Sequence, residues 1–170
     1  GSCVKKGTKA LVIATDIPKK SSNMSGYAET SQGIGAVAML VSDNPKIMQL
    51  DYGAYGVHSY EVMDTFRPLP DIEYGNSDLS LLSYLDCLTG SYKAYCERVE
   101  DVDLRSTFDY FAFHTPFGGA AKGGHRKLMR EFCKMSRKEI ESDFQKRVNP
   151  SLKFCVQVGN VYSATTYLAL

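Results

Sequence analysis

The sequence predicts an α/β protein on three observations. Short apolar runs that suit buried strands alternate with segments whose apolar residues recur at helical spacing. Of the 170 residues, 44% are hydrophobic and 23% are charged, which is ordinary for a soluble globular protein. The length suits one domain with a substantial core, and the composition excludes a collagen or an intrinsically disordered chain. No apolar run approaches the roughly 20 residues of a membrane span, so no membrane association is expected.

Two apolar runs near the start are expected to be central strands. Residues 10–14 (ALVIA) and 36–41 (AVAMLV) are continuously apolar, which is typical of strands buried on both faces. The polar stretch 19–32 between them, rich in Ser, Asn and Gly, is predicted to be a loop. Residues 43–46 (DNPK) are predicted to form a turn after the second strand.

Weaker strand signals follow. Residues 47–60 alternate weakly and contain two glycines, which predicts a third, poorer strand. Two prolines exclude helix from residues 66–70 and favour an extended segment. The aromatic run 108–113 predicts another strand, which ends at His114.

A long amphipathic helix is predicted to begin near residue 76. Asn76, Ser77 and Asp78 are its candidate N-caps. The apolar residues behind them recur at helical spacing: Leu81, Leu82, Leu85, Leu88, Tyr92, Tyr95, Cys96 and Val99. The expected polar face carries Ser83, Asp86, Lys93 and Glu97.

Further helices are predicted toward the end of the chain. One is expected over about residues 120–133, behind a pair of glycines. A second begins behind the capping box formed by Ser136 and Glu139 and is broken at Pro150. An apolar helix begins near residue 162.

Charge and cysteine usage narrow the function classes. The formal net charge of +1 gives no support for nucleic-acid binding. Residues 112–170 carry ten basic and four acidic side chains, which suits either an acidic partner or a solvated surface. Five cysteines at wide spacings, with no C-x-x-C motif, do not suit a disulfide framework or a zinc site. Reduced thiols in a cytoplasmic protein are therefore expected.

Two polar residues are the candidates for chemistry. His114 follows an apolar run and precedes a Gly-rich helix start, a position where α/β folds build sites. A neutral imidazole donates a hydrogen bond, and a small pKa shift makes it an acid or a base. Asn160 lies in a predicted turn and has an amide that suits an oxyanion. The structural alternatives are a core histidine bonded to a backbone carbonyl and an asparagine that only forms the turn.

The segments around these residues resemble one enzyme family. "FAFHTPF", followed by a basic helix, and "VGNVYSATTYLAL" are similar to segments of the 3-hydroxy-3-methylglutaryl-CoA synthase family of the thiolase superfamily. "KALVIATD" and "TSQGIGAVAMLVSD" resemble that family's strands and connecting loop. "YEVMDTFRPLP" and "LSLLSYLDCL" resemble the polyketide-pathway members, the β-branching synthases that act on carrier-protein thioesters.

The resemblance implies the layered αβαβα fold of the thiolase superfamily, with this chain as an internal segment. Residues 1–75 would end the N-terminal half of that fold, and residues 76–170 would begin the C-terminal half. It also implies a homodimer with no cofactor of its own. The substrates would be phosphopantetheine thioesters, carried on acyl carrier proteins or on CoA.

The resemblance further implies roles for single residues. His114 matches the family's histidine that binds and polarises the acceptor, and Asn160 matches the asparagine that helps hold the acceptor's oxygen. The family's nucleophilic cysteine and glutamate base lie upstream of the part matched by residues 9–16, and Cys3 comes nearest to that cysteine without matching it. The isolated chain is therefore not expected to catalyse the reaction.

The predicted helix over about residues 120–133 has a basic stripe. Lys122, Arg126 and Arg130 are spaced four residues apart, opposite an apolar stripe that includes His125. The basic stripe is expected either to be a solvated face or to bind a phosphopantetheine carrier. Arg130, together with Asp86, is the candidate for recognition of an acidic carrier protein, and His125 is expected to be a packing residue.

The predicted activity is that of a condensing acyltransferase in polyketide biosynthesis. An acetyl group from a donor carrier protein would be joined to a carrier-bound β-ketoacyl thioester in an aldol-type reaction, which makes a 3-hydroxy-3-methylglutaryl-like branch. Three alternatives stay open. They are the primary-metabolism enzyme that uses acetyl-CoA and acetoacetyl-CoA, another ketoacyl synthase of the superfamily, and a non-catalytic carrier-binding module.

Overall fold

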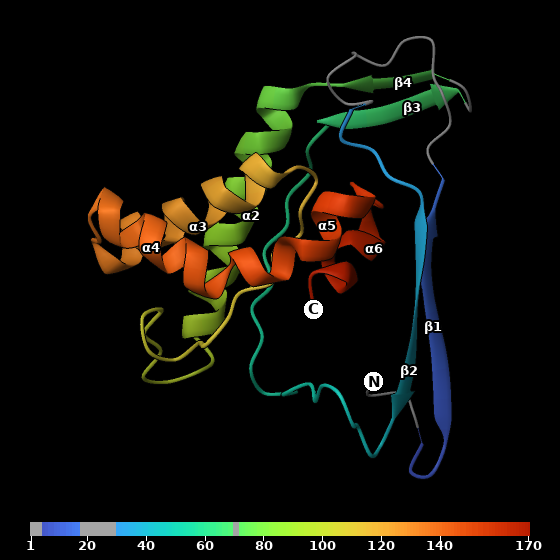
Figure 1. Cartoon of the computed structure of the whole chain (residues 1–170), viewed down its shortest axis with the longest axis horizontal. Helices are drawn as coiled ribbons and strands as arrows, with labels where there is room; N and C mark the ends of the chain where they lie inside the picture. Colours follow the sequence, from blue (N-terminus) through green and yellow to red (C-terminus); the bar gives the residue numbers. More distant parts are fainter. Residues whose placement is uncertain (1–4, 18–29, 70–71) are drawn as a thin grey trace.

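The computed structural model describes residues 5–17, 30–69 and 72–170 (Figure 1). The chain is a mixed α/β structure, as predicted. Its strands, in chain order, are β1 (Lys9–Asp16), β2 (Gly35–Ser42), β3 (Thr65–Leu69) and β4 (Ile72–Gly75). Its helices are α2 (Ser77–Cys96), α3 (Gly118–Cys133), α4 (Arg137–Arg147), the 3-10 helix η1 (Asn149–Leu152), α5 (Lys153–Val158) and α6 (Ser163–Leu168).

The elements are arranged in three groups (Figure 1). Helices α2, α3 and α4 form a helical layer on one side, and the long antiparallel pair β1–β2 lies on the other side. Between them lie α5 and α6, and α6 packs against both β1 and β2. The short antiparallel pair β3–β4 lies beyond the first turns of α2. This arrangement places the last helix of the chain at the junction of the sheet and the helical layer.

The two predicted apolar strands are confirmed as β1 and β2, but their expected burial is wrong. Ala10 pairs with Val41 on the face that α6 partly covers, and both are partly buried. Leu11 pairs with Leu40 on the opposite face, where they are 62% and 65% exposed. The reason is that no segment in the described ranges packs over this second face.

The prediction of a third, poorer strand over residues 47–60 is also wrong. This segment has no strand partner among the described residues, and within it residues 56 and 58 lie against α2. Gly56 makes the closest approach, because a Cβ atom there would lie 2.0 Å from the carbonyl oxygen of Ser91. The guanidinium of Arg98 lies 4.0 Å from the centroid of the Tyr55 ring. Residues 55–58 therefore lie against α2 and the residue Arg98 that follows it, rather than in a sheet.

Replacing Gly56 with alanine is expected to lower the free energy of unfolding by about 1–3 kcal/mol. The added methyl group would meet backbone atoms of Ser91 and Tyr95 that cannot move without disturbing α2. Gly53→Ala is the matched control, because the nearest atom to its Cβ is a carboxylate oxygen at 3.5 Å. Urea unfolding of the two variants measures the difference. Equal stabilities would show that Gly56 is not packed against α2 as described.

The strand predicted over residues 108–113 is not formed within the described part of the chain. The segment is held to α4 instead, because the Phe111 N–H donates to the Arg147 carbonyl at 2.8 Å. Its rings pack on one another, with 5.6 Å between the centroids of Phe108 and Phe111 and 5.9 Å between those of Phe111 and Phe113. The extended segment predicted over 66–70 is confirmed over the described residues as β3.

Helix α2 begins where its cap predicts but buries a wider surface than expected. The Asn76 side chain accepts from the Leu79 N–H at 3.0 Å, as an N-cap does. Ser83, which was expected on the polar face, is 7% exposed and donates to the Ser80 carbonyl. Leu82, which was expected on the apolar face, is 60% exposed. The helix has more than one packed side, since α3 and residues 56–58 both contact it.

The core lies between α3, α4 and the segment that leads to His114. The capping box of α4 is confirmed, because the Ser136 N–H donates to the Glu139 carboxylate at 2.8 Å and the Glu139 N–H donates back to the Ser136 hydroxyl at 3.4 Å. The most buried apolar residues of this core are Leu104, Ala121, Leu128, Met129, Ile140, Phe144 and Val148. This core fixes the backbone on which His114 sits.

Parts of the sequence-based prediction lie outside the described residues. They are Cys3 and most of the loop predicted over 19–32. At the described end of that loop, Gln32 forms an isolated parallel β-bridge with Asn160, so the loop contacts the turn that holds Asn160. None of the described helices combines the length and the apolar character that crossing a membrane requires.

Candidate active site

Asn160 lies in a turn whose backbone is tied to the loop before β2. Its N–H donates to the Ser31 carbonyl and its carbonyl accepts from the Gly33 N–H, both at 2.8 Å. Gly159 supplies a φ of 84°, which suits glycine. Tyr162 has a φ of 47°, which is uncommon for a large side chain and marks local strain. The loop before β2, which is far from Asn160 in the sequence, therefore holds this turn in one conformation.

The side chain of Asn160 is oriented by two donors. Its Oδ1 accepts from the Tyr162 N–H and from the Thr165 hydroxyl, both at 3.0 Å. Because a backbone N–H can only donate, the oxygen of the carboxamide must face it. The Nδ2 amide is therefore the part of the side chain that is left to donate to a ligand.

His114 is held by its backbone and its neighbours. The Tyr84 hydroxyl of α2 donates to the His114 carbonyl at 3.0 Å. Phe113 and Thr115 on either side are 7% and 5% exposed, so the flanking backbone is embedded in the core. The ring itself is partly buried, and its Nδ1 lies 3.4 Å from the Thr166 hydroxyl. This contact replaces the backbone carbonyl that a structural histidine was expected to meet.

Burial sets the charge of the His114 ring. Removal of the ring from solvent lowers the pKa of His114 below its usual 6.5, so the imidazole is neutral at neutral pH. With Nδ1 facing the Thr166 hydroxyl, a neutral ring protonated at Nε2 presents that N–H as a hydrogen-bond donor. Such a donor suits an oxygen that gains negative charge.

The structure brings the two predicted residues to the same short helix. Asn160 contacts Thr165, and His114 contacts Thr166, the next residue of α6. Forty-five residues separate His114 from Asn160 in the sequence. Two consecutive residues of α6 therefore contact the two predicted side chains.

A cysteine lies beneath this site without being activated. Cys155 is 5% exposed, and its thiol donates to the Thr165 carbonyl with Sγ 3.7 Å from the oxygen. Burial raises the pKa of the Cys155 thiol, so little of the reactive thiolate is present at neutral pH. Its position and protonation state are those of a packing residue.

Sequence reasoning missed a buried charged cluster behind the site. His125 is fully buried, as its place in the apolar stripe predicts, and its Nε2 lies 2.7 Å from the Asp143 carboxylate. Arg147 forms a two-point contact with the same carboxylate at 2.7 and 2.8 Å. Arg147 also donates to the carbonyls of Leu104 and Phe108 at 2.7 and 2.8 Å. The i, i+4 spacing of Asp143 and Arg147 is the only trace of this cluster in the sequence.

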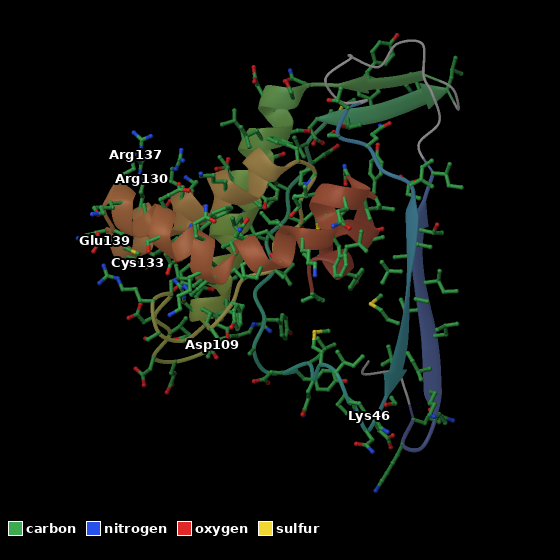
Figure 2. The ribbon with its side chains drawn as sticks, in the orientation of Figure 1. Lys46, Asp109, Arg130, Cys133, Arg137 and Glu139 are labelled. Atoms are coloured by element: carbon green, nitrogen blue, oxygen red, sulfur yellow. The ribbon has the colours of Figure 1, made fainter. Side chains whose placement is uncertain are left out.

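The residues predicted to bind a carrier are spread over the helical layer. Lys122 is paired with Glu141 at 2.9 Å, and Arg126 is partly buried. Arg130 is exposed, and Figure 2 shows it with Arg137 at the end of the layer farthest from β1 and β2. Asp86 is exposed on α2, and no ion pair joins it to Arg130 in the described ranges. The structure therefore connects His114 and Asn160 through adjacent residues of α6, whereas the carrier-binding role of Asp86 and Arg130 stays a prediction.

Other candidate features do not add to the site. No cluster of three or more metal-ligating side chains occurs among the residues that the structure describes. A shallow hollow of about 350 Å³ lies at the other end of α3, away from the segment that leads into that helix. It is lined by Tyr92, Val102, Asp103, Leu104, Arg105, Phe132 and Cys133.

Comparison with known proteins identifies the family. No family model matches the chain. A curated relative, the polyketide biosynthesis 3-hydroxy-3-methylglutaryl-ACP synthase PksG of Bacillus subtilis, is 50% identical over 172 aligned residues, which cover 96% of this chain. A solved structure, the curacin biosynthetic pathway HMG synthase in complex with acetyl donor-ACP, matches 99% of the chain at 55% identity with a TM-score of 0.94. The chain belongs to the 3-hydroxy-3-methylglutaryl synthase family.

Within this family the chain is more similar to the polyketide-pathway members. The hydroxymethylglutaryl-CoA synthase of Enterococcus faecalis is 30% identical over 166 aligned residues, which is well below the identity to PksG. The predicted thiolase-like fold and the predicted polyketide branch are confirmed by these matches. The chain spans 41% of the length of PksG and 40% of that of the Enterococcus enzyme.

Proposed function

We propose that this chain forms the acceptor-binding part of a polyketide-type 3-hydroxy-3-methylglutaryl synthase. The full-length protein would condense a carrier-bound acetyl group with a carrier-bound β-ketoacyl thioester. The contact of His114 and Asn160 with adjacent residues of α6 is the observation that supports this function. Two neutral donors at one place suit a ketone oxygen that becomes an alkoxide.

The proposed reaction uses a nucleophile and a base from outside this chain. An acetyl group moves from the donor thioester to a cysteine, and a carboxylate removes a proton from its methyl group. The resulting carbanion attacks the β-carbon of the acceptor, and the ketone π electrons move to its oxygen. In the proposed arrangement, His114 Nε2 and Asn160 Nδ2 donate to that oxygen until it is protonated to the tertiary alcohol. Water then releases the product from the cysteine.

Analysis of the product tests the proposed function. The full-length protein is incubated with an acetyl-carrier protein and a β-ketoacyl-carrier protein, and the acceptor is examined by intact mass spectrometry. The expected product carries a 3-hydroxy-3-methylglutaryl-like branch. Efficient turnover with acetyl-CoA alone would favour the primary-metabolism reaction, and a decarboxylative Claisen product would favour a ketoacyl synthase. No condensation product at all would favour a carrier-binding module.

The proposed partners are acyl carrier proteins, and the proposed assembly is a homodimer. A related enzyme was solved in complex with its donor carrier protein, which supports the first of these. The basic excess of residues 112–170 suits a carrier with an acidic surface. Exposed Arg130 is the best-placed member of the basic stripe, because Lys122 is already paired with Glu141.

Charge reversal of Arg130 is expected to weaken use of the carrier-borne donor. Arg130→Glu should raise the KM for acetyl-carrier protein about fivefold to tenfold, since surface charges steer encounter, and added salt should reduce the difference. A small acetyl thioester should be used as well by the variant as by the wild type. Lys138→Glu, an exposed charge reversal on α4, is the matched control. An equal loss with both substrates would argue for a folding defect and against carrier recognition.

A further inference from the structure

Two consecutive threonines of α6 contact the two side chains that are proposed to bind the acceptor oxygen. Thr165 contacts Asn160, and Thr166 contacts His114. Thr165 is fully buried, and its hydroxyl makes two hydrogen bonds at once. It accepts from the Val161 N–H at 2.7 Å and donates to Asn160 Oδ1 at 3.0 Å. Because the accepting role is taken by a backbone N–H, the hydroxyl proton is directed to the asparagine.

The neighbouring hydroxyl serves the other donor. Thr166 Oγ1 lies 3.4 Å from His114 Nδ1, on a ring that burial keeps neutral. A hydroxyl that donates to Nδ1 requires the ring proton to sit on Nε2. Thr166 is therefore placed to donate to His114 Nδ1 when the ring carries its proton on Nε2. Thr165 adds a second donor to the carboxamide oxygen that the Tyr162 N–H already orients.

We propose that Thr165 and Thr166 are the positioning residues of the acceptor site. Thr165, together with the Tyr162 N–H, holds the Asn160 amide toward the acceptor oxygen, and Thr166 donates to His114 Nδ1 so that the ring proton sits on Nε2. Neither hydroxyl touches the substrate, so each acts through its partner. This inference rests on the proposed function, since it assigns roles relative to the acceptor oxygen.

The test is a pair of double-mutant cycles in the full-length protein. Thr165→Val removes the hydroxyl and keeps the shape, and it is expected to slow condensation by about 10- to 100-fold. Acetyl loading of the enzyme should be unchanged, and Thr165→Ser should restore condensation to within about twofold of the wild type. In an Asn160→Ala background, Thr165→Val should have no further effect, because its partner is already gone. Thr166→Val should behave in the same way toward His114→Ala.

The outcomes separate this inference from the proposed function. If Asn160→Ala and His114→Ala leave condensation unchanged, the proposed function and this inference both fail. If those variants lose condensation but Thr165→Val and Thr166→Val do not, or if the effects multiply in the double variants, only the positioning roles fail. Thr165→Ala is the second variant should the valine variant not fold, since it adds no new atoms. Failure of both to fold while Thr165→Ser is stable would assign the Thr165 hydroxyl to folding instead.

Discussion

Replacing His114 with alanine is expected to slow condensation by the full-length protein by about 10²–10³-fold. The substitution removes one of the two neutral donors proposed to meet the ketone oxygen as it gains charge. Acetyl transfer to the enzyme should be retained, because the histidine is proposed to act on the acceptor and not on the donor. Single-turnover measurements with a pre-acetylated enzyme isolate the condensation step.

The control for this experiment is the first half-reaction of the same variant. If acetyl loading falls as far as condensation, the loss reflects damage to the fold rather than to the acceptor site. Full condensation by His114→Ala would show that this histidine is structural, like His125. A lower rate that is recovered with His114→Gln would show that donation of a hydrogen bond, rather than proton transfer, is the required role.

Replacing Arg147 with methionine is expected to lower the free energy of unfolding by about 3–5 kcal/mol. The change leaves the Asp143 carboxylate, which is 16% exposed, without its two-point partner. It also leaves the carbonyls of Leu104 and Phe108 without the guanidinium that donates to both. Lys146→Met is the matched control, because Lys146 is the exposed neighbour in the same turn of α4. Equal stability of the two variants would contradict the structural role given to the buried cluster.

The same cluster predicts how stability depends on pH. Burial alone would raise the pKa of Asp143, but hydrogen bonds from Arg147 and His125 outweigh it and lower that pKa below 3.8. A lowered pKa in the folded state means that the Asp143 carboxylate contributes its stabilisation fully above about pH 4. This contribution is lost as the pH falls below 3.8 toward the folded-state value. Arg147→Met should therefore lose less stability between pH 5 and about pH 3 than the wild type does.

Local signals in the sequence were sufficient to place the starts of α2 and α4. Asn76 and the Ser136–Glu139 box specify where α2 and α4 begin, because capping depends on neighbouring residues. The two apolar runs of β1 and β2 were equally clear. The position of His114 before a helix and of Asn160 in a turn followed from the same local patterns. That both hold one acceptor oxygen was an expectation of the family resemblance, and their contacts with Thr165 and Thr166 are consistent with it.

What the sequence did not reveal depends on distant partners. Residues 47–60 and 108–113 have strand-like composition, yet neither forms a strand in the described ranges. Residues 56 and 58 lie against α2, and Phe111 is hydrogen-bonded to α4. Ser83 is buried because α2 is packed on more than one side, which a single apolar stripe does not indicate. The pairing of His125 with Asp143 joins residues 18 positions apart on different helices. The spacing of apolar residues along the chain carries no information about contacts between side chains that are distant in the sequence.

The most direct measurement is a crystal structure of the full-length protein with a β-ketoacyl acceptor bound. The expected result is one ketone oxygen with His114 Nε2 and Asn160 Nδ2 each about 2.7–3.1 Å away. An acceptor oxygen bound by other groups, with these two side chains directed into separate regions, would contradict the proposed site and the enzymatic role built on it.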